Sequence, residues 1–247
     1  MKIPKFAYFL LLIVLSFFES FGQELITDRP DQTESSVSVP KKSLQIEFGF
    51  LYGNLKENDV SINDILLPTV LFRYGLFKGF ELRLVTQLER LKTGNDTILG
   101  FSDLEIGGKI EILNKENINT QIAFLSHLIL LTGTKGLSGD KFGVVNKLAF
   151  SHDINDAISV GYNIGYDYFG IGKGIPVYSL SFGFSLNDKI SVYVEPYGEY
   201  LNFERFIMNS DAGITYLLKQ NLQLDFSFGT GINHKMYYLA MGLSWRI

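Results

Sequence analysis

The sequence predicts an all-β protein: a transmembrane, antiparallel, up-and-down β-barrel of twelve strands, preceded by a signal peptide that is cleaved on export. Three observations lead to this prediction. Apolar and polar residues alternate with period 2 in twelve separate runs, which is typical of strands with one apolar face. Short and long polar connections alternate between those runs, as they do in outer-membrane barrels. The chain is also rich in glycine (24 residues) and aromatic residues (14%), with only 19% charged residues.

The composition excludes several other classes of protein. A chain of 247 residues without cysteine cannot form a disulfide scaffold or a cysteine-ligated metal site. A net charge of −4 without a basic cluster argues against nucleic acid as a partner. The mean hydropathy of +0.14 is too low for a helical membrane protein with several spans, which needs repeated apolar runs of about 20 residues. We expect no cofactor and no bound metal.

The N-terminal segment 1–22 predicts a secretory signal peptide. Two lysines precede an apolar run over residues 6–18, and small residues before Gln23 suit signal peptidase. An N-terminal membrane anchor is the alternative, but it needs a longer apolar run. We therefore expect an exported protein whose mature chain begins at Gln23.

Residues 23–42 predict a polar arm. Within it, residues 28–36 have no periodicity, and three carboxylates stand at spacing three. A calcium ion is one reading of that spacing, but the glycine-containing pattern of a dedicated calcium loop is missing. We expect instead a periplasmic arm or a plug that Arg29 pins to an inner carboxylate. The residues assigned to the plug are Asp28, Arg29, Asp31 and Glu34.

Residues 43–247 predict the barrel. Leu44 and Ile46 alternate with Gln45 and Glu47, and the same alternation recurs to the C-terminus. Most runs have at least the 9–11 residues that a tilted membrane strand requires. The expected strands are residues 43–53, 64–76, 79–91, 101–113, 120–132, 141–152, 157–169, 175–186, 189–201, 208–218, 221–232 and 236–247.

The connections between these runs alternate in length, so we place the short ones in the periplasm and the longer ones outside. The short connections are residues 76–78, 114–119, 153–156, 187–188 and 219–220. The longer connections are residues 54–63, 92–100, 133–140, 170–174 and 202–207.

A soluble β-sandwich also has alternating strands, but two features favour the barrel. A sandwich has no reason to gather its long connections at one end, or its outward aromatic residues in two belts. Amphipathic rings suit the headgroup level of a membrane. The external belt is Tyr52, Tyr166, Tyr168, Tyr178, Tyr200 and Tyr237, and the periplasmic belt is Tyr74, Phe80, Phe150, Tyr216 and Trp245.

Several stretches resemble one known family. Residues 27–35 (TDRPDQTES) and 44–50 (LQIEFGF) resemble the start of mature outer-membrane proteins labelled "transporter", in the family called putative meta-pathway of phenol degradation. Residues 100–109 (GFSDLEIGGK) are similar to its Gly-x-x-Asp-x-x-x-Gly-x-Lys strand, residues 131–136 to its mid-chain loop, and residues 224–247 to its final hairpin. The resemblance implies an outer-membrane barrel associated with uptake of small hydrophobic or aromatic compounds.

The C-terminus departs from the usual pattern of such barrels, which end in an aromatic residue, whereas this chain ends in Ile247. The signal for the barrel assembly machinery is weaker for that reason. We still expect that machinery and outer-membrane lipid as partners. The expected location is the outer membrane of a Gram-negative bacterium.

The inward faces of a barrel carry its function. Inward charges of both signs either line a hydrated path or pair across the lumen as a packed polar core, and an ion pair is the favoured reading for any single residue. The charged residues expected to line the pore are Glu47, Arg73, Glu81, Arg83, Glu89, Asp103, Glu105, Lys109, Glu111, Lys147, Asp167, Glu195, Asp211 and Asp225.

Apolar side chains face inward by parity as well, among them Leu67 and Leu125. The run 120–132 is apolar on both faces. It either packs against the arm inside the barrel or forms part of an apolar path for a hydrophobic solute. The sequence leaves both alternatives open.

We do not expect an enzyme. Some outer-membrane barrels hydrolyse lipids with a Ser and a His on one face of a strand. None of His127, His152 and His234 has a serine two positions away, and the sequence has neither a Gly-x-Ser-x-Gly elbow nor a zinc spacing.

Three hypotheses for function follow from these patterns. The leading one is passage of a small, hydrophobic or aromatic solute through the lumen. The second is a closed structural or surface-interaction barrel without transport. The third, which we favour least, is a lipid-modifying enzyme of the outer membrane.

Overall fold

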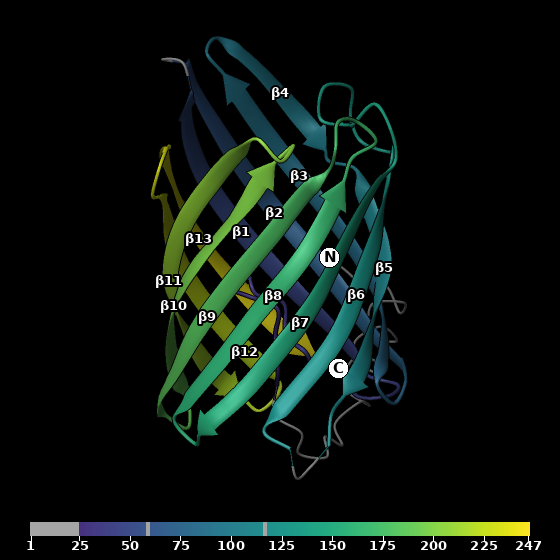
Figure 1. Cartoon of the computed structure of the whole chain (residues 1–247), viewed down its shortest axis with the longest axis vertical. Coiled ribbons are helices and arrows are strands. Elements are labelled where there is room, and N and C mark those ends of the chain that lie inside the picture. The colour runs from purple at the N-terminus through teal and green to yellow at the C-terminus, as the bar shows by residue number, and fades with distance from the viewer. Residues whose placement is uncertain (1–24, 58–59, 116–117) are drawn as a thin grey trace, which may run out of the picture.

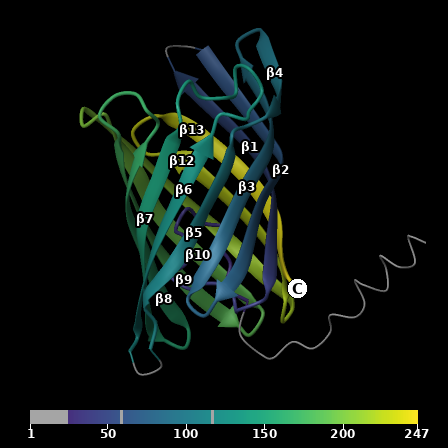
Figure 2. The same ribbon diagram turned by 90° about the vertical axis from the view of Figure 1, so that its right-hand side faces the viewer.

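The computed structural model describes residues 25–57, 60–115 and 118–247, which form one antiparallel sheet closed into a barrel (Figures 1 and 2). The sheet closes because β2 pairs with β1 on one side and β3 on the other. The signal peptide predicted for residues 1–22 lies outside the described residues. The described part of the chain contains no helix that is long and apolar enough to cross a membrane. The strands are β1 (Leu44–Glu57), β2 (Val60–Phe77), β3 (Phe80–Thr93), β4 (Asp96–Phe101), β5 (Leu104–Leu113), β6 (Thr120–Leu130), β7 (Gly143–Asn155), β8 (Ile158–Tyr168), β9 (Ile175–Asn187), β10 (Ile190–Leu201), β11 (Arg205–Lys219), β12 (Leu222–Gly231) and β13 (Lys235–Arg246).

The prediction of a twelve-stranded wall is confirmed, with one wall strand divided in two. The outer part of β3 pairs with β4 and its inner part pairs with β5, so β4 and β5 together occupy a single place in the wall. The division falls at Ser102 and Asp103, which lie between these two strands.

Two connections expected to be loops are strand instead. The stretch 92–100 folds into a hairpin in which Thr93 pairs with Asp96, and only Gly94 and Asn95 lie between the two strands. The prediction of a loop over residues 54–63 is also wrong, because β1 and β2 stay paired as far as Glu57 and Val60. These hairpins carry the wall beyond the height that the sequence predicts, and both project at the upper end in Figure 1.

The alternation of faces is broken in the middle of β2. Leu66 pairs with Leu51 and Thr69 pairs with Gly49, so the two residues Leu67 and Pro68 form a bulge without partners on β1. A proline, which has no N–H to give to the ladder, is tolerated at such a bulge. The expectation that Leu67 faces the lumen is therefore wrong, because its side chain is 54% exposed on the outside.

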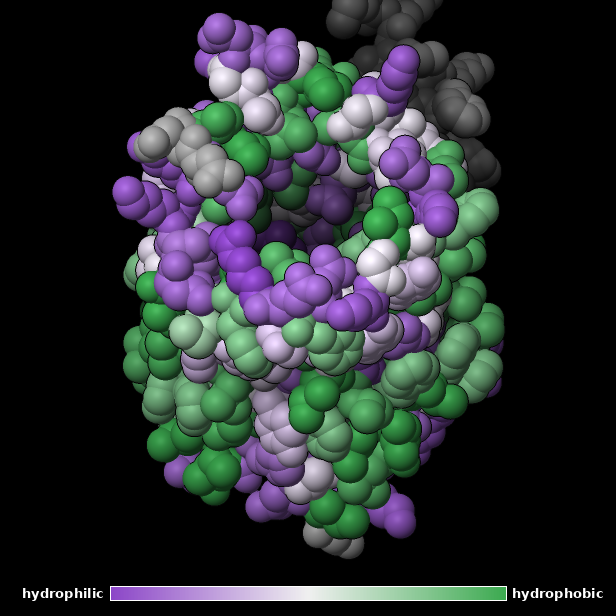
Figure 3. Space-filling view, turned by 45° about the horizontal axis from the view of Figure 1, so that its top comes forward, coloured by the Kyte–Doolittle hydropathy of each residue, from purple (hydrophilic) through white to green (hydrophobic). Residues whose placement is uncertain are grey.

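The barrel has a lipid-facing exterior and two distinct ends. Exposed apolar side chains cover the outside of the wall, as the hydrophobic belt in Figure 3 shows. The tight turns after β2, β7, β9 and β11 all lie at the lower end in Figure 1, which we take as the periplasmic end. The longer connection between β6 and β7 lies at the opposite, external end.

Candidate functional site

Residues 25–43, which we call the arm, thread through the lumen. In Figure 2 this segment runs inside the lower half of the barrel. Its backbone N–H groups donate hydrogen bonds to carboxylates of opposite walls: that of Gln32 to Glu195 on β10 (2.7 Å) and that of Val39 to Glu81 on β3 (2.7 Å). Ser36 has no exposed surface. The arm is thus packed as part of the interior of the barrel.

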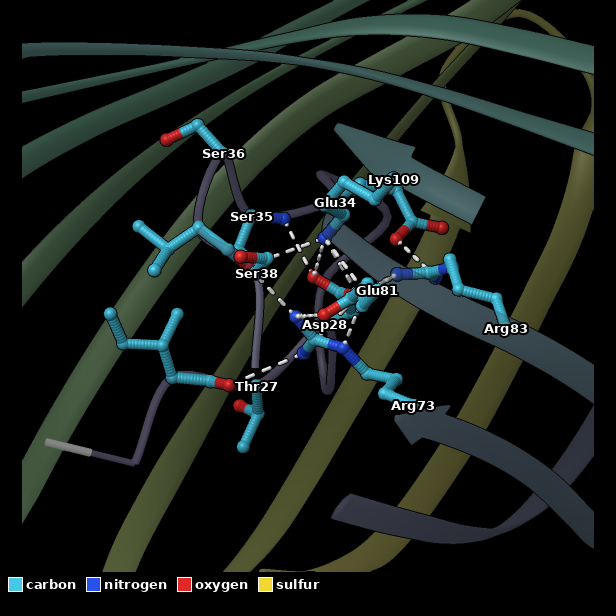
Figure 4. Close-up of polar contacts among 12 residues, drawn as sticks. Thr27, Asp28, Glu34, Ser35, Ser36, Ser38, Arg73, Glu81, Arg83 and Lys109 are labelled. Carbon is cyan, nitrogen blue, oxygen red and sulfur yellow. Dashed lines mark hydrogen bonds and ion pairs between the residues drawn. The ribbon is translucent and has the colours of Figure 1, made fainter. Parts of the chain in front are cut away.

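A cluster of charged side chains binds the arm to the first strands (Figure 4). Glu81 Oε1 accepts hydrogen bonds from Arg73 Nε (2.9 Å) and from Arg83 Nη1 (2.9 Å). Lys109 Nζ donates to both oxygens of Asp28 (3.0 Å each). All of these wall side chains are fully or almost fully buried. The charge cluster consists of Asp28 and Glu34 of the arm with Glu47, Arg73, Glu81, Arg83 and Lys109 of the wall.

The strand register explains why the wall requires a carboxylate from the arm. Arg73 lies directly opposite Arg83 across β2 and β3, and like charges in that position destabilise a sheet. Asp28 Oδ2 lies between the two guanidinium groups, 3.3 Å from Arg73 Nη1 and 2.5 Å from Arg83 Nη1. Without Asp28 and Glu34, three buried cations would share only the carboxylates of Glu47 and Glu81. Such a set of unpaired buried charges is costly.

Two carboxyl groups of the arm have opposite environments. Burial alone would raise the pKa of Asp28, but the nearby cations of Arg73, Lys109 and Arg83 outweigh it and hold that pKa well below its usual range. Burial raises the pKa of Asp31 well above its usual range, and the carboxylate of Glu195 adds to the rise. The arm therefore docks with Asp28 ionised and with Asp31 favoured in its neutral form.

Arg29 occupies a space that two glycines leave open. Gly49 and Gly242 pair across β1 and β13, and a Cβ on either one would lie 2.3 Å from an atom of the Arg29 side chain. From this space the guanidinium group reaches Asp225 on β12 (Nη2 to Oδ1, 3.1 Å). The structure thus places Arg29 against an inner carboxylate, and its role in holding a plug stays a prediction.

A second set of contacts ties the arm to the opposite wall. The Thr33 hydroxyl lies 2.6 Å from that of Ser179 and also donates to Glu195. The backbone N–H of Glu34 donates to Asn163 Oδ1 (2.7 Å), and Asn163 Nδ2 donates back to the carbonyl oxygen of Glu34 (3.1 Å). The arm therefore crosses the lumen from β1–β5 to β8–β10 and divides the space inside.

Two chambers lie on either side of the arm. The external chamber has a volume of about 390 Å³ and opens into the hollow visible in Figure 3. The inner chamber, of about 420 Å³, lies toward the periplasmic turns. The external chamber is lined mainly by Leu55, Lys147, Asn163, Asp167, Val177, Tyr178, Ser179, Tyr197, Glu199, Ile207, Asn209 and Met236. The inner chamber is rich in hydroxyl groups, with Ser151, Ser159, Ser181, Ser191 and Thr215 on the wall and Thr33 and Ser35 on the arm, and the carboxyl group of Asp31 also lines it.

His127 is a member of the site that the sequence did not select. Its Nε2 accepts a hydrogen bond from Arg83 Nε (2.9 Å), and its Nδ1 lies 3.0 Å from Glu105. Because the Arg83 group can only donate, the proton of a neutral His127 must lie on Nδ1 and point to Glu105. The sequence did contain one signal for it: by the period-2 alternation of its strand, His127 faces the same way as Leu125, which was expected to point inward. Leu125 itself is fully buried and is not among the residues that line either chamber.

The remaining charged residues expected in the lumen divide into three groups. Lys147 and Asp167 line the external chamber. Glu111 accepts hydrogen bonds from Ser38 of the arm (2.7 Å), and Asp211 accepts one from Tyr238 (2.5 Å). Glu89 accepts a hydrogen bond from Ser102 (2.6 Å) at the division of the wall strand.

Asp103 holds a loop of the external end. Its two carboxylate oxygens accept hydrogen bonds from Gly133 N (2.8 Å), Ser138 Oγ (2.7 Å) and Gly139 N (2.8 Å). All three donors belong to the connection between β6 and β7. Asp103 thus fixes that connection over the place where the wall strand divides.

The site shows no arrangement typical of a metal centre. Within the described ranges, no group of three or more His, Asp or Glu side chains is placed to hold a metal ion. Four of the carboxylates that reach the lumen, Glu47, Glu81, Glu195 and Asp211, are bonded to cations, amides and hydroxyl groups of the arm and the wall.

Comparison with known proteins gives one family match and several structural neighbours. The family model described as putative MetA-pathway of phenol degradation matches residues 27–247. An outer-membrane channel from Pseudomonas putida F1 is similar in structure, with a TM-score of 0.74 and 11% identity over 86% of this chain and 98% of that one. The KdgM porin in complex with disordered oligogalacturonate has a TM-score of 0.57 and 11% identity over 81% and 98% of the two chains. The toluene transporter TbuX of Ralstonia pickettii has a TM-score of 0.51 and 9% identity over 86% and 91%. No curated protein matches the sequence.

Proposed function

Because the chain belongs to the family described as putative MetA-pathway of phenol degradation, we propose that it is an outer-membrane channel that passes a small, mainly apolar solute through its lumen. The family resemblance in the sequence and the barrel of the Gram-negative outer membrane are both confirmed. One observation carries the proposal: the lumen contains two chambers of several hundred Å³, and the arm crosses the lumen between them. Displacement of the arm is expected to join them into one path.

The lining of the external chamber supports the choice of solute. Leu55, Val177 and Ile207 provide apolar surface there. Its polar lining includes the amide of Asn209 and the carboxylate of Asp167, groups that can accept hydrogen bonds. The solute expected to bind is therefore a compact apolar molecule that carries one or two hydrogen-bond donors.

The arm is proposed to act as a plug. It is tethered through ion pairs and hydrogen bonds rather than through a ladder with a wall strand, apart from a bridge between Lys41 and Gly75. Removing it leaves the hydrogen-bonded wall intact, because the barrel closes between β1 and β13 without it. The opened lumen would be lined by charged groups that water can solvate.

Single-channel conductance in planar bilayers tests this proposal. The mature protein is compared with a variant that lacks residues 23–36. We expect rare or no openings in the intact protein and frequent steps in the deletion variant. Steps in both would mean that the arm does not block the path, and silence in both would contradict the channel. The external chamber is tested by block of the conductance with cyclohexanol, with methoxycyclohexane as the probe that lacks a donor.

A closed structural barrel is the second candidate, favoured by the buried ion pairs that fill the lumen around the arm. It predicts no conductance and no uptake of solute into vesicles by either form. We also propose that the protein is not a lipid hydrolase, because His127 is engaged by Arg83 and Glu105 rather than by a serine. Lipase activity that is lost in His127→Ala would contradict this.

A further inference from the structure

Four cationic side chains lie on the outer surface of neighbouring strands at the external end of the barrel. Leu55 and Met236 line the external chamber, so the adjacent residues of β1 and β13 face outward. On β3, Arg83 points into the lumen, and the alternation from it directs even-numbered residues outward. The outward cations are Lys56 on β1, Arg90 and Lys92 on β3 and Lys235 on β13, which we call the cationic wall patch.

The strand register places these residues close together. Lys56 lies directly opposite Lys235 across β1 and β13. Arg90 and Lys92 lie on β3, two strands from β1, and each pairs with a residue of β2, the strand between them. Strands in a sheet are about 4.8 Å apart, so the patch extends over about 15 Å, comparable to a lipid headgroup with its sugars.

Exposed apolar and aromatic side chains share the outer surface with these cations. Leu99 on β4 pairs with Arg90 and is 65% exposed, and Phe101, two residues further along β4, is 58% exposed. Tyr52 and Tyr237, with their ring centroids 6.3 Å apart, lie in the same ladder rows as Arg90 and Lys92. Cations beside tyrosines and apolar side chains are typical of a lipid–headgroup boundary.

The polar side chains between the cations form a ladder of hydrogen bonds. Asn54 Nδ2 donates to Ser61 Oγ (2.8 Å) and to Asn63 Oδ1 (2.9 Å), and the Tyr52 hydroxyl donates to the same Asn63 oxygen (3.2 Å). These amides and hydroxyl groups lie at the height of the cations. They are suited to hydrogen bonds with the sugar or phosphate oxygens of a headgroup.

The opposite side of the external rim is different. There β8 to β11 present aromatic side chains, including a stacked pair, Tyr200 and Phe206 (4.3 Å), and the exposed rings of Tyr166 and Tyr178. The ion pairs of the external loops, Arg205 with Glu57 and Lys173 with Glu204, use other residues. Among the described residues, Arg90, Lys92 and Lys235 have no carboxylate within ion-pair distance. The cationic side of the rim therefore has uncompensated charge next to lipid.

We propose that the cationic wall patch binds the phosphate-bearing headgroup of an anionic lipid in the outer leaflet. Arg90 provides the planar guanidinium group suited to bidentate contact with phosphate, and the lysines provide point charges around it. The Asn and Ser ladder orients the remaining polar part of the headgroup. The acyl chains of the lipid lie against the exposed apolar side chains next to the patch, among them Leu99 and Phe101.

Binding of diphosphoryl lipid A to the folded mature protein in phosphatidylcholine nanodiscs tests this proposal, with native mass spectrometry to count bound lipid. The triple variant Arg90→Gln/Lys92→Gln/Lys235→Gln is compared with the wild type. A matched control is Lys135→Gln/Lys141→Gln/Lys173→Gln, which removes the same charge from exposed positions of the external loops. Each cation near an anionic surface contributes about fivefold to binding, so the wall variant should lose on the order of 100-fold and the control variant little.

Three results would overturn the proposal: equal binding by the wall variant, an equal loss in the control variant, or undiminished binding of lipid A from which both phosphates have been removed. Heat-modifiable migration on a gel shows whether each variant is folded. If the triple variant fails to fold, Arg90→Gln and Lys235→Gln alone should each lose about fivefold, and unchanged binding by both would overturn the proposal as well.

Discussion

Asp28 is the residue on which the docking of the arm depends most. Its carboxylate is shared by Arg73, Arg83 and Lys109, and each of those cations is buried. Removal of one partner from a buried ionic network typically costs about 3–5 kcal/mol, because the others remain buried without compensation. This loss destabilises the docked arm rather than the wall, since the wall strands keep their own backbone hydrogen bonds.

Asp28→Asn should therefore weaken docking by about 3 kcal/mol, which is more than a hundredfold in the equilibrium between docked and displaced arm. The expected result is a large rise in the open fraction of single channels. Asp188→Asn, in an exposed periplasmic turn, is the matched control and should leave the open fraction unchanged. An open fraction in Asp28→Asn equal to that of the wild type would contradict the role of the arm as a plug.

Asp31 should make docking depend on pH in the opposite sense to Asp28. Its pKa in the docked arm is raised by burial and by Glu195, so protonation favours docking. The groups that face it are the carboxylates of Glu195 and Asp211 and the hydroxyl of Ser181. This contribution is fully present below the ordinary pKa of an aspartate, about 4, and is lost as the pH rises through the raised value.

Openings of the wild-type channel should accordingly become more frequent as the pH rises from the ordinary pKa of an aspartate, about 4, through the raised value. Asp31→Asn should remain closed over that range, because its side chain has no charge to gain. Conductance records at several pH values test both statements. The same rise with pH in Asp31→Asn would show that another group is responsible.

At the scale of elements, most strands could be predicted because the period-2 pattern is strong where one face meets lipid and the other a polar lumen. The hairpin of β3 and β4 was missed because its residues do not alternate: residues 92–97 are polar or glycine, and Ile98 and Leu99 then place apolar side chains on both faces. A signal was present in Gly94-Asn95, a two-residue turn typical of hairpins, in which Gly94 has φ of +59°. The bulge at Leu67 required knowledge of the partner strands.

The loop between β6 and β7 should depend on Asp103. Hydrogen bonds to a carboxylate contribute about 1–3 kcal/mol each when buried, and less at this exposed position. Asp103→Ala should therefore speed tryptic cleavage at Lys135 and Lys141 by about tenfold, which corresponds to about 1.4 kcal/mol of local opening. Asp140→Ala is the control in the same loop. Equal cleavage rates in the wild type and Asp103→Ala would mean that the loop is held by other contacts.

Considered as a whole molecule, the wall has more inward acidic than basic residues. Without the arm, an acidic lumen concentrates cations and repels anions. The inward charges of the wall are Arg73, Arg83, Lys109, Lys147 and Arg246 against Glu47, Glu81, Glu89, Glu105, Glu111, Asp167, Glu195, Glu199, Asp211 and Asp225.

The variant that lacks residues 23–36 should consequently be selective for cations. The reversal potential across a tenfold gradient of potassium chloride measures this directly, and its sign should correspond to potassium as the more permeant ion. Glu195→Gln in the deletion variant should reduce the selectivity, whereas Asp188→Asn, outside the lumen, should not. A reversal potential near zero or of the opposite sign would contradict this view of the lumen.

The arrangement of the arm could be predicted only in part. Its charges suggested attachment to inner carboxylates, and Arg29 does reach Asp225. Which wall residues it meets depends on the closed register, since the contact between Arg29 and Asp225 spans 196 positions of sequence. His127 could not be placed with Arg83 for the same reason.

The position of Arg29 has a consequence for the order in which the protein is made. Arg29 lies over the seam where the first strand meets the last, in the space left by Gly49 and Gly242, and bonds to β12. These partners emerge from the ribosome at opposite ends of synthesis. The N-terminal segment must therefore wait, undocked, until the last hairpin arrives. Arg29 can reach its place only after the seam has closed, so the earliest part of the mature chain is seated only when the latest part has arrived.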